Sequence, residues 1–301
     1  LPGQGEIRQT FDRLRERLDS TISLHPLYGN LSLAEQQAAI DPASKNRKLV
    51  LATNIAETSL TIEGINVVID SGLAREPSFD PGNGMSRLQT VKISAGSTIQ
   101  RAGRAGRLEP GRCYRLWSEH QQDQLAPHVT PEIHKTDLAG MALQLFQWGF
   151  QSPDELNFLD LPKAGNWEQA VSLLNDLGAL KPDLSSLTEH GEAMALIPAH
   201  PRLAHLLIKG AEAGNTEKAA LLAALLSDRN PLSQENPDIT THLAVLSGEE
   251  TCAKQYRGWC QRTQKLAKQL AIHVRNIPQD SVLPAAEILG YLLACAYPDR
   301  I

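Results

Sequence analysis

The sequence predicts an α/β lobe with a parallel, doubly wound sheet, followed by mainly helical domains. In residues 1–122, short apolar strands alternate with amphipathic helices, and this alternation is typical of parallel sheets. From about residue 130 the composition changes to Leu- and Ala-rich helices with few strand signals. The chain of 301 residues is long enough for two or three domains, each with its own core.

The lobe is expected to begin with a helix over residues 6–20, whose apolar residues recur at the spacing of one buried stripe. A capping box formed by Ser32 and Glu35 predicts the start of a second helix, which ends near residue 40. Strands are expected at residues 21–27, 48–53, 66–70 and 112–117.

Two β-rich runs, at about residues 74–79 and 86–93, flank the segment Asp80-Pro81-Gly82-Asn83-Gly84. Asp, Pro, Gly and Asn favour tight turns, so the two runs are predicted to form a β-hairpin.

The second half is predicted to begin with helices at residues 135–148 and 166–177. In the second of these, Asn166 and Gln169 resemble a cap and Gly178 a stop signal. With a short ribbon ending near residue 191, these helices predict a winged-helix domain over residues 123–197. Further helices predict a helical domain over residues 198–301, and they are expected at residues 205–213, 216–226, 248–273 and 281–296.

Charge is distributed unevenly along the chain. The net charge of −5 excludes a bulk polyanion binder, so any nucleic-acid contact must be a local patch. Residues 1–122 hold 15 Lys and Arg against 13 Asp and Glu, and the remainder holds 14 against 21. Residues 101–115 contain five arginines and one acidic residue, Glu109. Phosphate chemistry is therefore expected in the first part.

Cysteine usage and hydropathy give mainly negative predictions. The four cysteines (Cys113, Cys252, Cys260 and Cys295) show no C-x-x-C pairing and no histidine at metal-ligand spacing. We therefore expect reduced thiols in a cytoplasmic protein, and no metal site. No apolar run reaches transmembrane length. Residues 1–5 are expected to form a loop that follows a strand outside this sequence, so we expect a fragment.

The stretch 100–107, QRAGRAGR, carries the strongest functional signal. On a helix, Gln100, Arg104 and Arg107 share one face, while Arg101 points elsewhere. An amide and two planar guanidinium groups suit a polyphosphate. The alternatives are a solvated basic helix, which the small Ala and Gly residues disfavour, and a capping box in which Gln100 bonds the backbone of Ser97.

A second polar stretch, TNIAETSLTI over residues 53–62, follows a predicted strand. Open α/β sheets bind ligands at the carboxyl ends of their strands. The hydroxyl and amide groups of this stretch can donate hydrogen bonds to phosphate oxygens.

Together, QRAGRAGR and TNIAETSLTI resemble motifs VI and V of superfamily 2 helicases of the DEAH/RHA group. LPGQGEI at the start resembles the tail of motif IV, and RLEPGRCYRLW is most similar to bacterial members of the group. The resemblance covers essentially the whole chain. It implies a second RecA-like lobe over residues 1–122, then the winged-helix domain and a helical ratchet-like domain.

The resemblance also implies roles for single residues in binding ATP. Gln100 matches the glutamine that positions the attacking water, and Arg104 and Arg107 match the arginine fingers. Ser59 matches a serine that senses the γ-phosphate. Glu63 replaces the usual ribose-binding Asp with a longer arm, and Ile40 replaces an aromatic residue that stacks on adenine, so weak base selectivity is expected.

Nucleic-acid contacts follow from the same resemblance. Thr53, Asn54 and Thr61 match motif V positions near the nucleic-acid backbone. The hairpin at about residues 74–93 resembles the DEAH-type hairpin that lies between strands, where Arg87 and Lys92 would contact the backbone. The alternative is a simple edge hairpin whose basic residues are only solvated.

The sequence contains no G-x-x-x-x-G-K-[ST] loop and no DEAH box, which cradle the phosphates and bind Mg²⁺. ATP and Mg²⁺ are therefore expected only together with a first RecA-like lobe, and this chain alone is expected to be inactive. Expected partners are that lobe and single-stranded RNA, with the protein monomeric and no membrane involved. The alternatives are a DNA-preferring translocase and a non-catalytic nucleic-acid-binding module.

Overall fold

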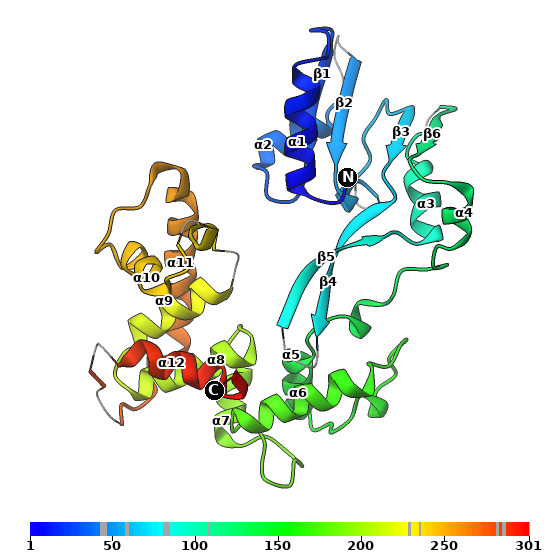
Figure 1. The fold of residues 1–301 in the computed structure, drawn as a ribbon. Coiled ribbons are helices and arrows are strands. Elements are labelled where there is room, and N and C mark those ends of the chain that lie inside the picture. The colour runs from blue at the N-terminus through cyan, green and yellow to red at the C-terminus, as the bar shows by residue number, and fades with distance from the viewer. Residues whose placement is uncertain are drawn as a thin grey trace. The chain divides into compact units, whose positions relative to one another are not determined.

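A computed structural model describes the chain except for residues 43–46, 58–59, 81–84, 108, 228–229, 235, 281–282, 285–286 and 301. It divides into two compact units, Leu1–Thr136 and Asp137–Ile301 (Figure 1). The first unit contains the strands, and the second is mainly helical.

The first unit begins with α1 (Gln4–Arg15), β1 (Ile22–Leu27), α2 (Leu33–Ile40) and β2 (Arg47–Ala52). β1 and β2 pair in parallel, with Ile22 opposite Arg47. The apolar stripe of α1 packs on these strands, where Ile7 is fully buried beside Tyr28 and Leu51. The predicted capping box is confirmed, because the Ser32 hydroxyl accepts from the Glu35 amide and the Glu35 carboxylate from the Ser32 amide.

α1 ends at Arg15, so the prediction that it continues to residue 20 is wrong. The Asp19 carboxylate accepts a hydrogen bond from the Thr21 backbone amide at 3.0 Å. Such local bonds of Asp side chains compete with the helical pattern and favour a turn.

The remaining strands form two further pairs. β3 (Val67–Asp70) pairs in parallel with β6 (Arg112–Arg115). β4 (Leu73–Asp80) and β5 (Met85–Lys92) pair antiparallel, with Leu73 opposite Lys92 and Asp80 opposite Met85. The predicted hairpin is thus confirmed, while its connection, residues 81–84, lies outside the described residues. The parallel pairs β1–β2 and β3–β6 confirm the α/β class.

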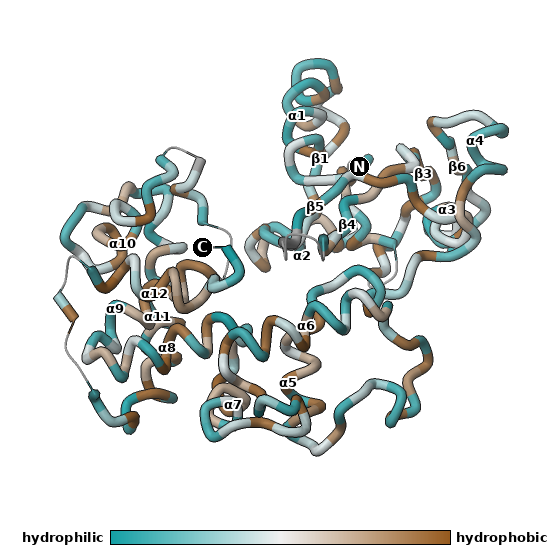
Figure 2. The backbone as a smooth tube through the Cα atoms, turned by 60° about the horizontal axis from the view of Figure 1, so that its bottom comes forward, coloured by the Kyte–Doolittle hydropathy of each residue, from teal (hydrophilic) through white to brown (hydrophobic). Residues whose placement is uncertain are grey.

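The second unit contains α5 (Ala139–Gln147), α6 (Ala164–Asp176), α7 (Glu189–Ala195), α8 (Pro201–Glu212), α9 (Thr216–Ser227), α10 (Ile239–Ser247), α11 (Arg257–Val274) and α12 (Ile288–Ala296). α8 packs against α9 and α12, and α9 packs against α11. The core includes the fully buried Leu206, Leu222 and Leu292. Figure 2 shows the apolar residues that line α8 and α12.

Several predicted helix starts in this unit are wrong, among them those of α8 and α12, which begin at Pro201 and Ile288 rather than at residues 205 and 281. α5 begins at Ala139 rather than residue 135, because the Asp137 carboxylate accepts from the Ala139 amide. Asn166 lies buried inside α6, whose cap position is Lys163. Gly248 does not begin a helix: its φ of +89° ends α10, a helix that was not predicted, and α11 begins at Arg257. Gly178, with φ +67°, follows α6 as predicted.

A half-buried histidine pair in the second unit predicts a pH-dependent stability. His205 Nδ1 lies 2.7 Å from His190 Nε2. Burial, with the nearby His190 second, lowers the pKa of His205 from 6.5 to about 3. Below pH 6.5 the histidine of the unfolded chain binds a proton that His205 in the folded chain does not bind. The free energy of unfolding therefore decreases as the pH is lowered, by up to ~1.4 kcal/mol per pH unit.

We therefore expect His205→Gln to flatten the decline in unfolding free energy between pH 6.5 and 4, measured by urea denaturation. The exposed His273 in the same unit offers a matched control, and His273→Gln should keep the wild-type slope. Equal slopes for His205→Gln and wild type would contradict the assignment.

Candidate functional site

The arginine-rich stretch begins in α3 (Ala95–Ala102). Ser94 caps this helix, and its hydroxyl accepts a hydrogen bond from the Ser97 amide at 3.1 Å. Ser97 is buried inside the helix, so the predicted capping box between Ser97 and Gln100 is wrong. The Gln100 side chain is exposed and available to a ligand.

α3 ends at Ala102, with Gly103 at its cap position. Arg104 and Arg107 therefore lie in the following turns, and the prediction that they share a helix face with Gln100 is wrong. Gly103 and Gly106 explain the early end, because glycine disfavours the helix. The turns nevertheless bring the three side chains together: with Gly103, they line one open hollow of about 320 Å³.

Arg101 joins three segments of the first unit. Its Nε lies 2.9 Å from Glu57 Oε2, and its Nη1 lies 2.9 Å from Asp70 Oδ1. Nη1 also donates to the Leu73 carbonyl at 3.2 Å. The side chains of Arg101 and Asp70 are 12% and 3% exposed, so this is a buried ion pair. The sequence predicted no role for Arg101. The available signal was that Glu57 follows one predicted strand and Asp70 ends another.

Arg104 is half-buried and contacts the polar stretch after β2. It donates from Nη1 to the Leu60 carbonyl at 2.9 Å and from Nη2 to the Glu57 carbonyl. Arg107, in contrast, is exposed and forms no ion pair with any residue that the structure describes. The hollow thus contains one tethered and one unneutralised guanidinium group, an arrangement that attracts an anion.

The predicted residues of the polar stretch lie at the carboxyl end of β2. Thr53 precedes the short 3-10 helix η1 (Asn54–Ala56), and Asn54 is exposed. Thr61 and Glu63 are also exposed. Ser59 lies outside the described residues. Ile40, half-buried at the end of α2, is not among the residues that line the hollow, and neither is Glu63.

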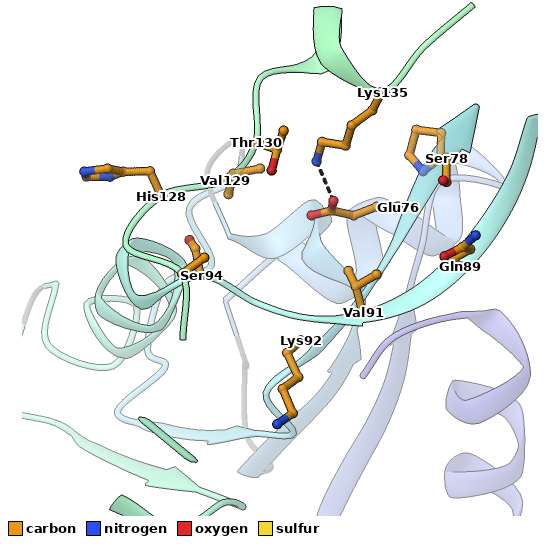
Figure 3. A pocket seen from close by; sticks show the side chains of 12 residues that line it. Glu76, Ser78, Gln89, Val91, Lys92, Ser94, His128, Val129, Thr130 and Lys135 are labelled. Atoms are coloured by element: carbon orange, nitrogen blue, oxygen red, sulfur yellow. Dashed lines mark hydrogen bonds and ion pairs between the residues drawn. The ribbon is translucent and has the colours of Figure 1, made fainter. Parts of the chain in front are cut away.

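A second pocket, of about 270 Å³, lies beside the hairpin and was not predicted. The other wall of the pocket comes from residues 126–135. This segment contacts the hairpin where the Phe79 amide donates a hydrogen bond to the Lys135 carbonyl at 2.8 Å. Figure 3 shows the Lys135 ammonium reaching the Glu76 carboxylate, at 2.5 Å. Lys92 also lines this pocket, while Arg87 is exposed on the same strand.

Gly111 supports the arginine-bearing turns. A Cβ atom at Gly111 would lie 2.1 Å from the carbonyl oxygen of Ala105, between Arg104 and Arg107. Gly111→Ala must displace the backbone at Ala105. We therefore expect the free energy of unfolding, measured by urea denaturation, to decrease by ~1–3 kcal/mol. Gly106→Ala is the matched control, because nothing lies within 4 Å of its Cβ; a loss as large there would contradict this explanation.

Comparison with known proteins identifies the class. Residues 6–109 match the model of the helicase conserved C-terminal domain. This match covers β1 to β5, the polar stretch and the arginine-bearing turns described above, and it ends before β6. The chain therefore contains the C-terminal domain of a helicase.

Individual relatives indicate which helicases the chain resembles most specifically. The chain is 42% identical over 302 residues to the ATP-dependent RNA helicase HrpB of Escherichia coli (strain K12), and the match covers 100% of the chain and 35% of HrpB. It is 35% identical over 271 residues to the probable ATP-dependent RNA helicase DHX34 of Mus musculus, covering 87% of the chain and 24% of DHX34.

A solved structure shows the same similarity to HrpB. The crystal structure of the Escherichia coli DEAH/RHA helicase HrpB matches the whole chain with a TM-score of 0.84 at 39% identity, over 36% of that structure. Over its whole length the chain is thus similar to a DEAH/RHA helicase of the HrpB type, and it spans about a third of HrpB's length. No helix in the described part of the chain is long and apolar enough to cross a membrane.

Proposed function

We propose that this chain is the second RecA-like lobe and the following helical domains of an ATP-dependent RNA helicase. The observation that carries the proposal is the hollow where Gln100, Arg104 and Arg107 meet, beside the polar stretch at the carboxyl end of β2. The proposed domains are residues 1–122, a winged-helix domain at 123–197 and a ratchet-like domain at 198–301. We assign the protein to the cytoplasm as a monomer.

In this proposal the hollow binds the γ-phosphate of ATP. Arg107 and Arg104 stabilise the negative charge of the transition state, and Gln100 orients the attacking water. Arg104 would exchange its bonds to the Glu57 and Leu60 carbonyls for phosphate oxygens. Ser59 would contact the γ-phosphate, Glu63 the ribose and Ile40 the base.

The described residues contain no group of three or more His, Cys, Asp and Glu side chains that could hold a metal ion. We propose that the Mg²⁺ ligands and the phosphate-binding loop lie on a first RecA-like lobe. Residues 1–301 supply no Walker loop of their own.

Nucleic acid is proposed to bind through the polar stretch and the hairpin. Thr53, Asn54 and Thr61 would donate to backbone phosphates, and Arg87 and Lys92 would add charge from β5. Hydrolysis would then move the chain along a single strand. RNA is the proposed substrate because HrpB and DHX34 are described as RNA helicases.

Two preparations test the proposal: residues 1–301 alone, and the longest reading frame that contains them. We expect RNA-stimulated ATP hydrolysis and duplex unwinding only from the longer protein. Turnover by residues 1–301 that survives Arg104→Ala would overturn the assignment. A reading frame without a Walker loop would favour a non-catalytic binding module, and tighter competition by matched DNA than by RNA would favour a DNA translocase.

A further inference from the structure

Two cysteines in the second unit lie in direct contact. Cys252 Sγ and Cys260 Sγ are 2.6 Å apart, well inside the ~3.5–4 Å at which non-bonded heavy atoms pack. Cys252 lies in the segment between α10 and the short 3-10 helix η5 (Lys254–Tyr256), and Cys260 lies in the first turn of α11. The fold thus brings together two thiols that are eight positions apart in the chain, whereas the sequence, which has no C-x-x-C pairing, predicts only reduced thiols.

The two thiols differ in exposure. Cys260 is 5% exposed on the packed side of α11, whereas Cys252 is half-buried and reaches solvent. Burial, and then the neighbouring Cys252, raises the pKa of Cys260 to about 12. Cys260 is therefore a neutral thiol near pH 7, and of these two cysteines Cys252 is the one placed to meet a dissolved oxidant.

The other cysteines provide a contrast within the same chain. Cys113 lies on β6 in the first unit, and Cys295 lies on α12, where it interacts with Tyr291. Burial raises the pKa of both thiols. Neither has another cysteine in contact among the described residues.

We propose that Cys252 and Cys260 form a redox-sensitive pair that closes to a disulfide on oxidation by a peroxide. Cys252 loses its proton, the Cys252 thiolate attacks one peroxide oxygen, and the O–O bond breaks, which gives a sulfenic acid at Cys252. The departing hydroxide takes up the released proton and becomes water. The Cys260 sulfur then attacks the Cys252 sulfur, the S–O bond breaks, and the hydroxyl leaves as water with the Cys260 proton. Overall, two thiols and one hydrogen peroxide yield one disulfide and two waters.

The disulfide would close a ring over η5 and the first turn of α11. That ring joins the segment after α10 to a helix that packs against α9 and α10. Oxidation should therefore restrict opening of this part of the unit, while reduction by a dithiol should restore it.

Non-reducing peptide mapping tests the proposal directly. Trypsin cleaves after Lys254 and Arg257, so it separates the two cysteines into residues 230–254 and 258–262. After treatment of the 301-residue chain with hydrogen peroxide at neutral pH, we expect these peptides joined, two hydrogens lighter than their sum and released by dithiothreitol. A thiol reagent should then titrate two thiols under denaturing conditions instead of the four in the reduced chain.

Single substitutions test which two cysteines form the disulfide. Cys252→Ser and Cys260→Ser should abolish the joined peptide, whereas Cys113→Ser and Cys295→Ser should retain it. Because Cys252 is half-buried, Cys252→Ser should fold normally, which circular dichroism can check. Four titratable thiols after peroxide, sulfinic acid at Cys252 without the joined peptide, or a cross-link to Cys113 or Cys295 would each overturn the proposal.

Discussion

Replacing Arg107 by alanine in the full-length protein is expected to reduce the kcat of ATP hydrolysis by about 10³-fold or more. Arg107 is exposed and has no ion-pair partner among the described residues, so its charge is available to a phosphate. An interaction made only in the transition state affects kcat and leaves ground-state binding largely unchanged. Steady-state ATPase assays at saturating RNA, with RNA binding measured separately, provide the comparison.

Three variants separate this role from a structural one. Arg107→Lys keeps a charge but loses the planar fork, so partial activity is expected. Arg104→Ala should lose both ATPase activity and some stability, since Arg104 also donates to the Glu57 and Leu60 carbonyls. Arg112→Ala, at an exposed position on β6, should keep wild-type turnover. A kcat of Arg107→Ala within twofold of wild type would contradict the role of Arg107 as an arginine finger.

The arginine stretch shows what local sequence determines. The sequence predicts that Gln100, Arg104 and Arg107 share one site; these residues do line one hollow, and the binding of phosphate there stays a prediction. Their helical arrangement was wrong, because the same glycines that permit close approach also end α3 early. Ser94, rather than Ser97, provides the cap, and the two serines carry nearly equal local signals.

Other features depend on contacts between distant parts of the chain. The partners of Arg101 lie 31 and 44 positions away, and Lys135 meets Glu76 across 59 positions. Short-range patterns contain no information on such pairs, so both the Arg101 cluster and the pocket beside the hairpin were missed. The capping box at Ser32 was predicted correctly because all its atoms lie within four residues.

The cluster around Arg101 leads to the largest expected effect on stability. Arg101→Ala would leave Asp70, whose side chain is 3% exposed, without its cation. Removing one partner of a buried ion pair costs ~3–5 kcal/mol, because the remaining charge stays desolvated. Urea unfolding at pH 7 should therefore show a loss of that size for Arg101→Ala. The matched control, Arg107→Ala, removes an exposed guanidinium from the same stretch and should stay within ~0.5 kcal/mol of wild type.

Asp70→Asn separates the charge from the hydrogen bonds of this cluster. An asparagine oxygen can still accept from the Gly72 amide and from Arg101, which contact Asp70 Oδ1 at 3.0 Å and 2.9 Å. Arg101 would also keep Glu57 as an anionic partner at 2.9 Å. We therefore expect Asp70→Asn to cost less than Arg101→Ala. If Asp70→Asn costs as much or more, the stability of this cluster depends on the charge of Asp70 rather than on the set of donors that Arg101 provides.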